Sequence, residues 1–157
     1  MLNLPYLPIS SAYRHYATLG KQELFAELGW ASREVSSGSL RNSALLLSLA
    51  LASVGMSLPG RFLVSGGNLA GKMIETSASR LIECLKSRHL PPESIAFENC
   101  LENAADQLFG RRGIVAFVRD ASLGGALIAL LDGHNAYLAC LAAQTLQPLE
   151  VIFWPLD

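Results

Sequence analysis

Residues 41–60, RNSALLLSLALASVGMSLPG, decide the architecture of this chain. Large apolar side chains recur at helical spacing and occupy most of the helix circumference: Leu45, Leu46, Leu49 and Val54. Asn42 can cap the first turn and Gly55 ends the helix. The run is too short to span a bilayer, and Ser48 and Ser53 interrupt it. The stretch therefore predicts a buried central helix.

The flanking segments predict further short elements. Residues 12–28 have apolar side chains at helical intervals broken at Gly20, which predicts two short helices. SSGS (36–39) is predicted as a loop, and FLV (62–64) as a short strand before the glycine-rich SGGNLAGK (65–72). Residues 76–88 predict an amphipathic helix, because it would have Leu81, Ile82 and Leu85 on one side and Glu83, Lys86 and Arg88 on the other. Pro91 and Pro92 end it.

The last third has the composition of a sheet. Four short segments rich in apolar residues are separated by Gly, Asp or Pro, and we expect consecutive antiparallel strands at 113–118, 126–133, 135–142 and 149–156. The alanine and leucine content of the second and third segments leaves a buried helix open as an alternative for them. The expected fold class is α+β, with a helical N-terminal half packed on a C-terminal antiparallel sheet.

Composition limits the organisation and the class of partner. A chain of 157 residues with 51% hydrophobic and 16% charged residues predicts one domain over 1–157. The formal net charge of −1 argues against nucleic acid as a partner, because such binders gather basic residues on one face. The N-terminus has prolines and no basic cluster, so we expect synthesis in the cytoplasm without a signal peptide. The three cysteines have no metal-like spacing and are expected to be buried free thiols: Cys84, Cys100 and Cys140.

Taken in order, several segments carry a resemblance to a known family. They are RNSALLLSLALASVGMSLPG (41–60), VSGGNLAGK (64–72) with RLIECLKSR (80–88), RRGIVAF (111–117), ALIALLDG (126–133) and VIFWPL (151–156). This set resembles the group-four amidase effectors of the type VI secretion system, small antibacterial toxins that cut peptidoglycan stem peptides. The family has a helix beginning Asn-x-Cys-Ala, a Gly-Ile-Val strand, a Gly-His-aliphatic-Asp-Leu strand and a terminal Phe-Trp-x-Leu. The resemblance covers most of the chain from about residue 42 and implies a papain-like fold.

The sequence departs from the family at the positions that carry the chemistry. Ser43 stands where the family has its nucleophilic Cys, and Arg41 stands where it has Asn. The family Arg that follows the nucleophile is replaced by Leu46. When ALIALLDG is placed on the Gly-His-aliphatic-Asp motif, the base His becomes Leu127 and the Asp becomes Ala129. A serine depends on a well-placed base more than a cysteine does, because a cysteine at a helix N-terminus already offers a thiolate.

Other residues offer chemistry that we weigh against structural roles. His134, in the turn DGHN, is an alternative base for Ser43, although a turn histidine is expected to be exposed at the far end of a hairpin. Cys100 is more simply a half-buried thiol on a helix, and Asp132 a hairpin turn residue. GGNLAGKM (66–73) has the glycines and lysine of a phosphate loop but Met73 in place of Ser or Thr, which favours a surface turn.

No cofactor or metal is expected from the histidines and aromatics. His15 and His89 have no second ligand at metal-binding spacing. Four aromatic side chains could line a partner surface or pack the N-terminal helices: Tyr6, Tyr13, Tyr16 and Trp30.

Two functions remain open. The first is a degenerate, inactive amidase relative that binds a peptidoglycan fragment, an immunity or secretion protein, or a second copy of itself. The second is an active peptidoglycan amidase with Ser43 as its nucleophile. The resemblance implies delivery by type VI secretion to the periplasm of a target cell.

Overall fold

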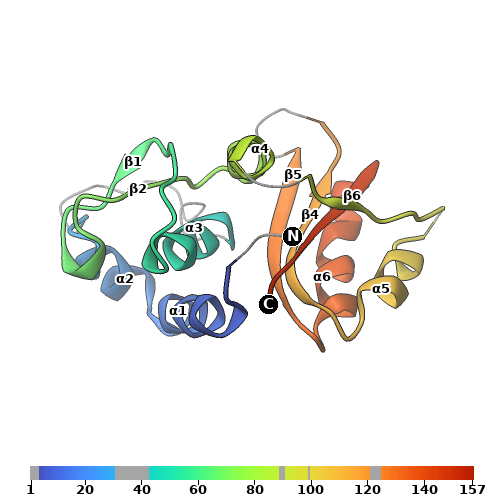
Figure 1. Cartoon of the computed structure of the whole chain (residues 1–157), viewed down its shortest axis with the longest axis horizontal. Helices are drawn as coiled ribbons and strands as arrows, with labels where there is room; N and C mark the ends of the chain where they lie inside the picture. The colour runs from blue at the N-terminus through green and yellow to red at the C-terminus, as the bar shows by residue number, and fades with distance from the viewer. Residues whose placement is uncertain (1–3, 31–42, 89–90, 99, 121–124) are drawn as a thin grey trace. The chain divides into compact units, whose positions relative to one another are not determined.

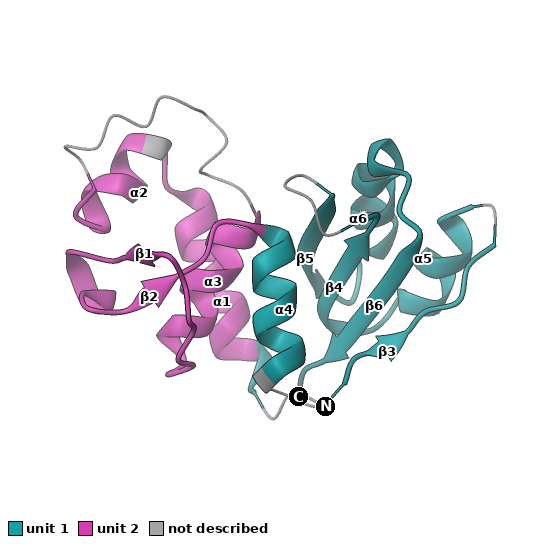
Figure 2. Ribbon diagram, turned by 90° about the horizontal axis from the view of Figure 1, so that it is seen from above, with its two compact units in different colours: residues 1–6, 78–157 teal, residues 7–77 magenta. Residues whose placement is uncertain are grey.

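The structure is a computed structural model that describes residues 4–30, 43–88, 91–98, 100–120 and 125–157 (Figure 1). The predicted loop at 36–39, the cap residue at 42, and positions 41 and 89 lie outside these ranges. The elements group into two compact units, one of Leu7–Ser77 and one of Met1–Tyr6 with Ala78–Asp157 (Figure 2). Each unit is described by itself below.

The Leu7–Ser77 unit contains helices and one small hairpin. Helix α1 (Tyr6–Thr18) and helix α2 (Lys21–Glu27) confirm the two predicted helices, with the break beside Gly20. Helix α1 begins six residues before the predicted start at 12. Pro8 is compatible with this earlier start, because it lies in the first turn, where no backbone N–H is needed. Strands β1 (Phe62–Leu63) and β2 (Met73–Ile74) pair antiparallel, with the 3₁₀ turn η2 (Gly67–Leu69) between them.

Helix α3 (Ser43–Ser53) is the helix predicted from residues 41–60. Every residue from Ala44 to Ala52 is buried, as an all-apolar circumference requires. Its C-terminal end is closed as predicted by Gly55, which has φ +89°. The amide of Gly55 donates to Ala52 and that of Met56 to Leu51, a pairing that satisfies the last carbonyls. Side chains of α3 form the unit's core with Leu24, Trp30, Val64, Ile74 and others.

The other unit is built on a four-stranded antiparallel sheet in the order β3-β6-β4-β5. Its strands are β3 (Glu93–Ser94), β4 (Arg112–Val118), β5 (Ala126–Asp132) and β6 (Glu150–Pro155). Helices α5 (Glu102–Leu108) and α6 (Ala136–Ala143) cover one face, and α4 (Ala78–Arg88) lies beside β5 away from them (Figures 1 and 2). The sheet and helices confirm the predicted α+β class.

The preferred prediction of a strand at 135–142 is wrong, and the helix left open as its alternative is what the structure has: the segment is α6, followed by the 3₁₀ turn η3 (Gln144–Leu146). AYLACLAA contains no β-branched residue, and alanine and leucine are strong helix formers. The fourth strand of the sheet is instead β3, two residues long, which lies before the segments expected to form strands. The strands predicted at 113–118, 126–133 and 149–156 are confirmed.

Candidate functional site

The position expected for the nucleophile is Ser43, the first residue of α3, and it is partly exposed. Leu46, one turn further along, is buried among the apolar side chains of the unit's core. Helix α3 contains no cysteine, and all three cysteines of the chain belong to the other unit. The first turn of α3 therefore presents a hydroxyl and no thiol.

Sequence reasoning missed a polar network, centred on Glu75, that contacts α3. The carboxylate of Glu75, 1% exposed, accepts hydrogen bonds from Nε and Nη2 of Arg61, each at 2.9 Å. It also accepts the backbone amides of Thr76 at 2.9 Å and Ser77 at 2.8 Å. The amide of Glu75 donates to Oγ of Ser48, at 2.9 Å. The network thus ties the end of β2 to α3, and no sequence motif marks it.

The partners of Glu75 decide its charge state. Burial alone would raise the pKa of the Glu75 carboxyl, but the hydrogen bonds from Arg61, Ser77 and Thr76 and the charge of Arg61 outweigh it and lower that pKa. The same pairing raises the pKa of Arg61. Both groups are therefore ionised at neutral pH and form an ion pair with two hydrogen bonds. We therefore assign this pair a structural role.

The positions expected for the base and acid lie on β5, whose two faces the sheet register separates. Leu127 pairs with Phe117 and Ala129 with Val115. Phe117 and Val115 belong to the core that α5 and α6 cover, and Ala129 packs against it. Because side chains alternate along a strand, Leu127 and Ala129 lie on the face covered by α5 and α6. Leu127 is 37% exposed.

The opposite face of β5 presents the alternate residues Ala126, Ile128 and Leu130, all of them buried. Leu130 and Trp154 both pair with Ile114, so the indole of Trp154 lies on this face too. Within the described residues, Nε1 of Trp154 is the one buried side-chain N or O atom without a hydrogen-bond partner. A register shifted by one residue would move the expected base and acid positions to this second face, at Ala126 and Ile128.

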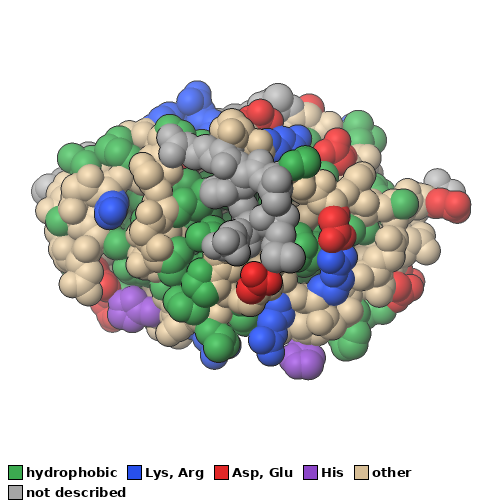
Figure 3. Space-filling model, in the orientation of Figure 1, with side chains coloured by type: hydrophobic (Ala, Val, Ile, Leu, Met, Phe, Trp, Pro, Cys, Tyr) green, Lys and Arg blue, Asp and Glu red, His purple; other side chains and the backbone are tan. Residues whose placement is uncertain are grey.

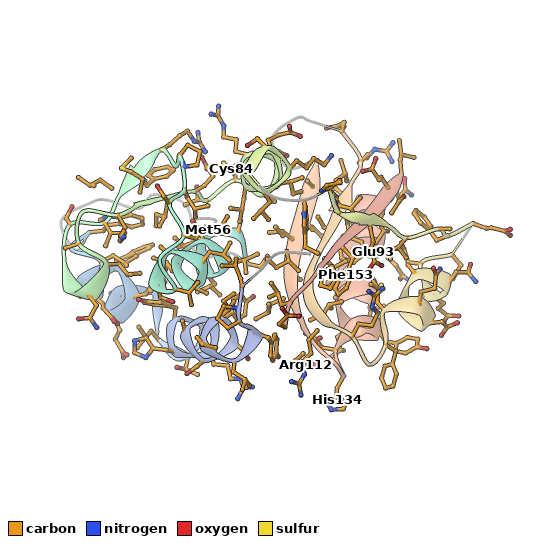
Figure 4. All side chains as sticks on the ribbon, in the orientation of Figure 1. Met56, Cys84, Glu93, Arg112, His134 and Phe153 are labelled. Carbon is orange, nitrogen blue, oxygen red and sulfur yellow. The ribbon has the colours of Figure 1, made fainter. Side chains whose placement is uncertain are left out.

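His134, the alternative base, lies in the turn from β5 to α6, which is a strand-to-helix turn and not the predicted hairpin turn (Figure 4). The Asp132 carboxylate accepts the amides of His134 at 2.8 Å and Asn135 at 3.0 Å. The Asn135 side chain accepts the Asp132 amide and donates to the Leu130 carbonyl. Asp132 thus holds a turn, but the prediction of a hairpin turn is wrong, because the turn leads from β5 into helix α6. The described residues give the His134 imidazole no hydrogen-bond partner, and its ring lies 6.4 Å from that of Phe109.

The cysteines only partly follow the prediction. Cys84 and Cys140 are buried free thiols, as expected, and burial raises the pKa of Cys140 to about 11. The prediction of a half-buried Cys100 on a helix is wrong, because Cys100 is exposed and precedes the first residue of α5 by two positions. Its Sγ accepts the amide of Glu102 at 3.4 Å.

The remaining candidates are structural. Tyr6, Tyr16 and Trp30 are buried, and Tyr13 packs against the same core as Tyr16 and Trp30. Of the two alternatives for these aromatics, the structure therefore has internal packing and not a partner surface. Residues 66–72 lie in the connection between β1 and β2, and Met73 is the first residue of β2. This agrees with the predicted surface turn. Nε2 of His15 lies 3.1 Å from Oε1 of Glu27, a hydrogen-bond contact that the sequence did not indicate.

Surface and cluster properties add three observations. On the face in Figure 3, acidic and basic side chains are interspersed and do not form a patch of one sign. Over the described residues, no group of three His, Cys, Asp or Glu side chains is placed to hold a metal ion. No helix in the described ranges is both long and apolar enough to cross a membrane.

Comparisons with known proteins support the fold. No protein-family model and no curated protein sequence matches this chain. Among solved structures, the effector Tae4 from Salmonella typhimurium, in complex with the immunity protein Tai4 from Enterobacter cloacae, is 15% identical with a TM-score of 0.69, covering 99% of this chain and 100% of that one. The type VI effector-immunity complex Tae4-Tai4 from Enterobacter cloacae gives 16% identity and a TM-score of 0.66, covering 99% of this chain and 100% of that one. At these identities, what the comparisons establish is that the chain has the fold of Tae4 over its full length.

Proposed function

We propose that this chain is a catalytically inactive relative of the peptidoglycan amidase effectors of the type VI secretion system, and that it acts by binding. The family resemblance and the Tae4 fold support the relationship. By analogy, the chain would be delivered to the periplasm of a target cell. Its partner would be a cell-wall peptide or a protein such as an immunity protein, since two of the similar effectors were crystallised with Tai4.

One observation carries the proposal of inactivity. The residues of β5 from 126 to 131 are Ala, Leu, Ile, Ala, Leu and Leu. Not one of these six side chains can accept or donate a proton, so these positions offer no general base in either register. The carboxylate at the end of β5, that of Asp132, accepts the amides of His134 and Asn135. The serine at the head of α3 would need such a base, because a hydroxyl is not ionised near neutral pH.

The competing function, cleavage by Ser43, rests on Ser43 beginning the buried helix. His134 would then have to act as its base. Catalytic histidines are usually oriented by a hydrogen bond to their second ring nitrogen, and the described residues give His134 none. This observation favours binding over catalysis.

The deciding experiment incubates the purified chain with peptidoglycan and measures two quantities. Released peptides are measured by mass spectrometry, and retained protein by co-sedimentation with intact sacculi. We expect no release by the wild type or by Ser43→Ala. Cleavage that is lost in Ser43→Ala would overturn the proposal and establish a serine-dependent amidase. Retention without cleavage assigns the cell wall as ligand, and no retention removes the cell wall and leaves a protein partner.

Two triple variants test whether the missing chemistry can be restored. Ser43→Cys, Leu127→His, Ala129→Asp follows the register taken from the sequence. Ser43→Cys, Ala126→His, Ile128→Asp places the same groups on the opposite face of β5. Because adjacent strand residues face opposite sides, we expect activity in at most one of them. Far-ultraviolet circular dichroism must first show that each variant folds, since Ala126 and Ile128 are buried.

A further inference from the structure

Helix α6 buries one face and leaves a second apolar face in contact with solvent. Ala136, Cys140 and Ala143 pack into the core of the sheet and α5. Tyr137, Leu138 and Leu141 are 46%, 70% and 61% exposed. Positions 137, 138 and 141 lie on one side of a helix because they are spaced by three and four residues.

The end of α5 extends this surface. Phe109 directly follows α5, is 53% exposed, and its ring centroid lies 5.8 Å from that of Tyr137. We define the α6 face as Phe109, Tyr137, Leu138 and Leu141. These are four of the eight exposed large hydrophobic side chains among the described residues. Scattered exposed leucines are ordinary, but contiguous ones mark a binding surface.

Two carboxylates border the α6 face. The hydroxyl of Tyr137 donates a hydrogen bond to the carboxylate of Asp106. Glu102 lies four residues before Asp106 on α5, so both carboxylates lie on the same side of that helix. The hydrogen bond to Asp106, burial and the charges of Asp106 and Glu102 raise the pKa of Tyr137. Within the described residues, neither Glu102 nor Asp106 forms an ion pair with a lysine or arginine. The border is therefore negative and not neutralised.

We propose that the α6 face binds a helix of a protein partner that presents leucine-like side chains flanked by lysines or arginines. Contact with the apolar side chains removes water from both surfaces, and basic residues neutralise Glu102 and Asp106. The inference stands on the α6 face and its acidic border and does not rest on the proposed function.

Charge argues against two other occupants. In a two-fold pairing of identical copies, each α6 face meets the same face, and neither this face nor its border contains a lysine or arginine. The carboxylates of the two copies would then gather without a counter-charge. An anionic membrane surface would also repel Glu102 and Asp106.

The test uses the full chain and two synthetic amphipathic peptides, one of leucine and lysine and one of leucine and glutamate. Binding is measured by fluorescence anisotropy at two salt concentrations. We expect the wild type to bind the lysine peptide and not the glutamate peptide. Leu138→Gln with Leu141→Gln should weaken binding about tenfold or more, because central apolar contacts dominate interface energies. Leu7→Gln on α1 is the matched control, since Leu7 is also 70% exposed, and should change nothing.

A second variant tests the acidic border. Glu102→Gln with Asp106→Asn should weaken binding several-fold and reduce its salt dependence, because it removes the screened charge attraction. Asn at 106 can still accept the hydrogen bond from Tyr137. Binding that is unaffected by these charges, equal binding of both peptides, or an equal loss in Leu7→Gln would overturn the proposal.

Self-association is measured in parallel by sedimentation. A dimer of the wild type that dissociates in the Leu138→Gln, Leu141→Gln variant would overturn the proposal in favour of a second copy. Binding to vesicles of phosphatidylcholine and phosphatidylglycerol with the same sensitivity would overturn it in favour of a membrane. A monomer that ignores vesicles and binds the lysine peptide supports it.

Discussion

Replacing Arg61 by alanine should destabilise the Leu7–Ser77 unit by about 2–3 kcal/mol. The change removes both guanidinium hydrogen bonds to Glu75, each at 2.9 Å. The two backbone amides still reach Oε2, but Oε1 loses its donor. Removing one partner of a buried pair costs about 3–5 kcal/mol. We place the cost below that range because the side chain of Arg61 is 41% exposed, so water can reach the vacated position.

Urea unfolding at pH 7, followed by fluorescence, measures this loss. Trp30 reports on this unit, since its indole donates to the Leu63 carbonyl of β1. Arg61→Lys keeps the charge without the two-pronged geometry and should fall between Arg61→Ala and the wild type. A double-mutant cycle with Glu75→Gln should give a coupling free energy of about 1–2 kcal/mol. A loss below about 0.5 kcal/mol in Arg61→Ala, or additive losses in the cycle, would show that the pair does not hold the hairpin.

Three further results are expected. The stabilisation from the lowered pKa of Glu75 should be complete above the unfolded-state pKa of about 4.3 and decline as the pH falls through the folded-state pKa, and Glu75→Gln should remove this part of the acid dependence of unfolding. A maleimide should modify Cys100 rapidly and Cys140 slowly, as intact mass would show, because burial raises the pKa of Cys140 to about 11. Gly60→Ala should cost about 2 kcal/mol or more in urea unfolding, because the new Cβ would collide with the backbone of Ile74.

The helical half of the fold could be predicted because its sequence patterns are local. Gly55 ended α3 in the prediction and ends it in the structure, with a positive φ that glycine adopts without strain. The all-apolar circumference of α3 predicted its burial equally directly. Such features depend on a few neighbouring residues and need no knowledge of the tertiary fold.

The third predicted strand failed because the deciding contacts are in the preceding turn. The Asp132 carboxylate accepts the amides of His134 and Asn135. The Asn135 side chain accepts the Asp132 amide and donates to the Leu130 carbonyl. These bonds direct the chain out of β5 into a helix. A short apolar run is compatible with strand or helix, so periodicity alone could not distinguish them.

The candidate site likewise has features that the sequence predicts and features that it does not. Ser43 could be placed at the head of a helix from the sequence, and the structure has it there. The Arg61–Glu75 pair could not be found, because its members are separated by 14 positions and carry no motif. Likewise, the apolar face of α6 could not be predicted from a segment interpreted as a strand.

The register of β5 decides which face of the sheet the expected base and acid positions occupy. It does not change which kind of side chain stands at them. Leu127 pairs with Phe117 and Ala129 with Val115, which places both on the face that α5 and α6 cover. Leu130 pairs with Ile114, which places it on the opposite face, with Trp154. A one-residue slip exchanges one pair of aliphatic side chains for another, because every residue from 126 to 131 is Ala, Leu or Ile. In either register, residues 126–131 present only aliphatic side chains to both faces of β5. Activity in the wild type would have to come from a proton acceptor outside residues 126–131, and the two triple variants, which supply one on each face of β5, measure what its absence from these positions costs.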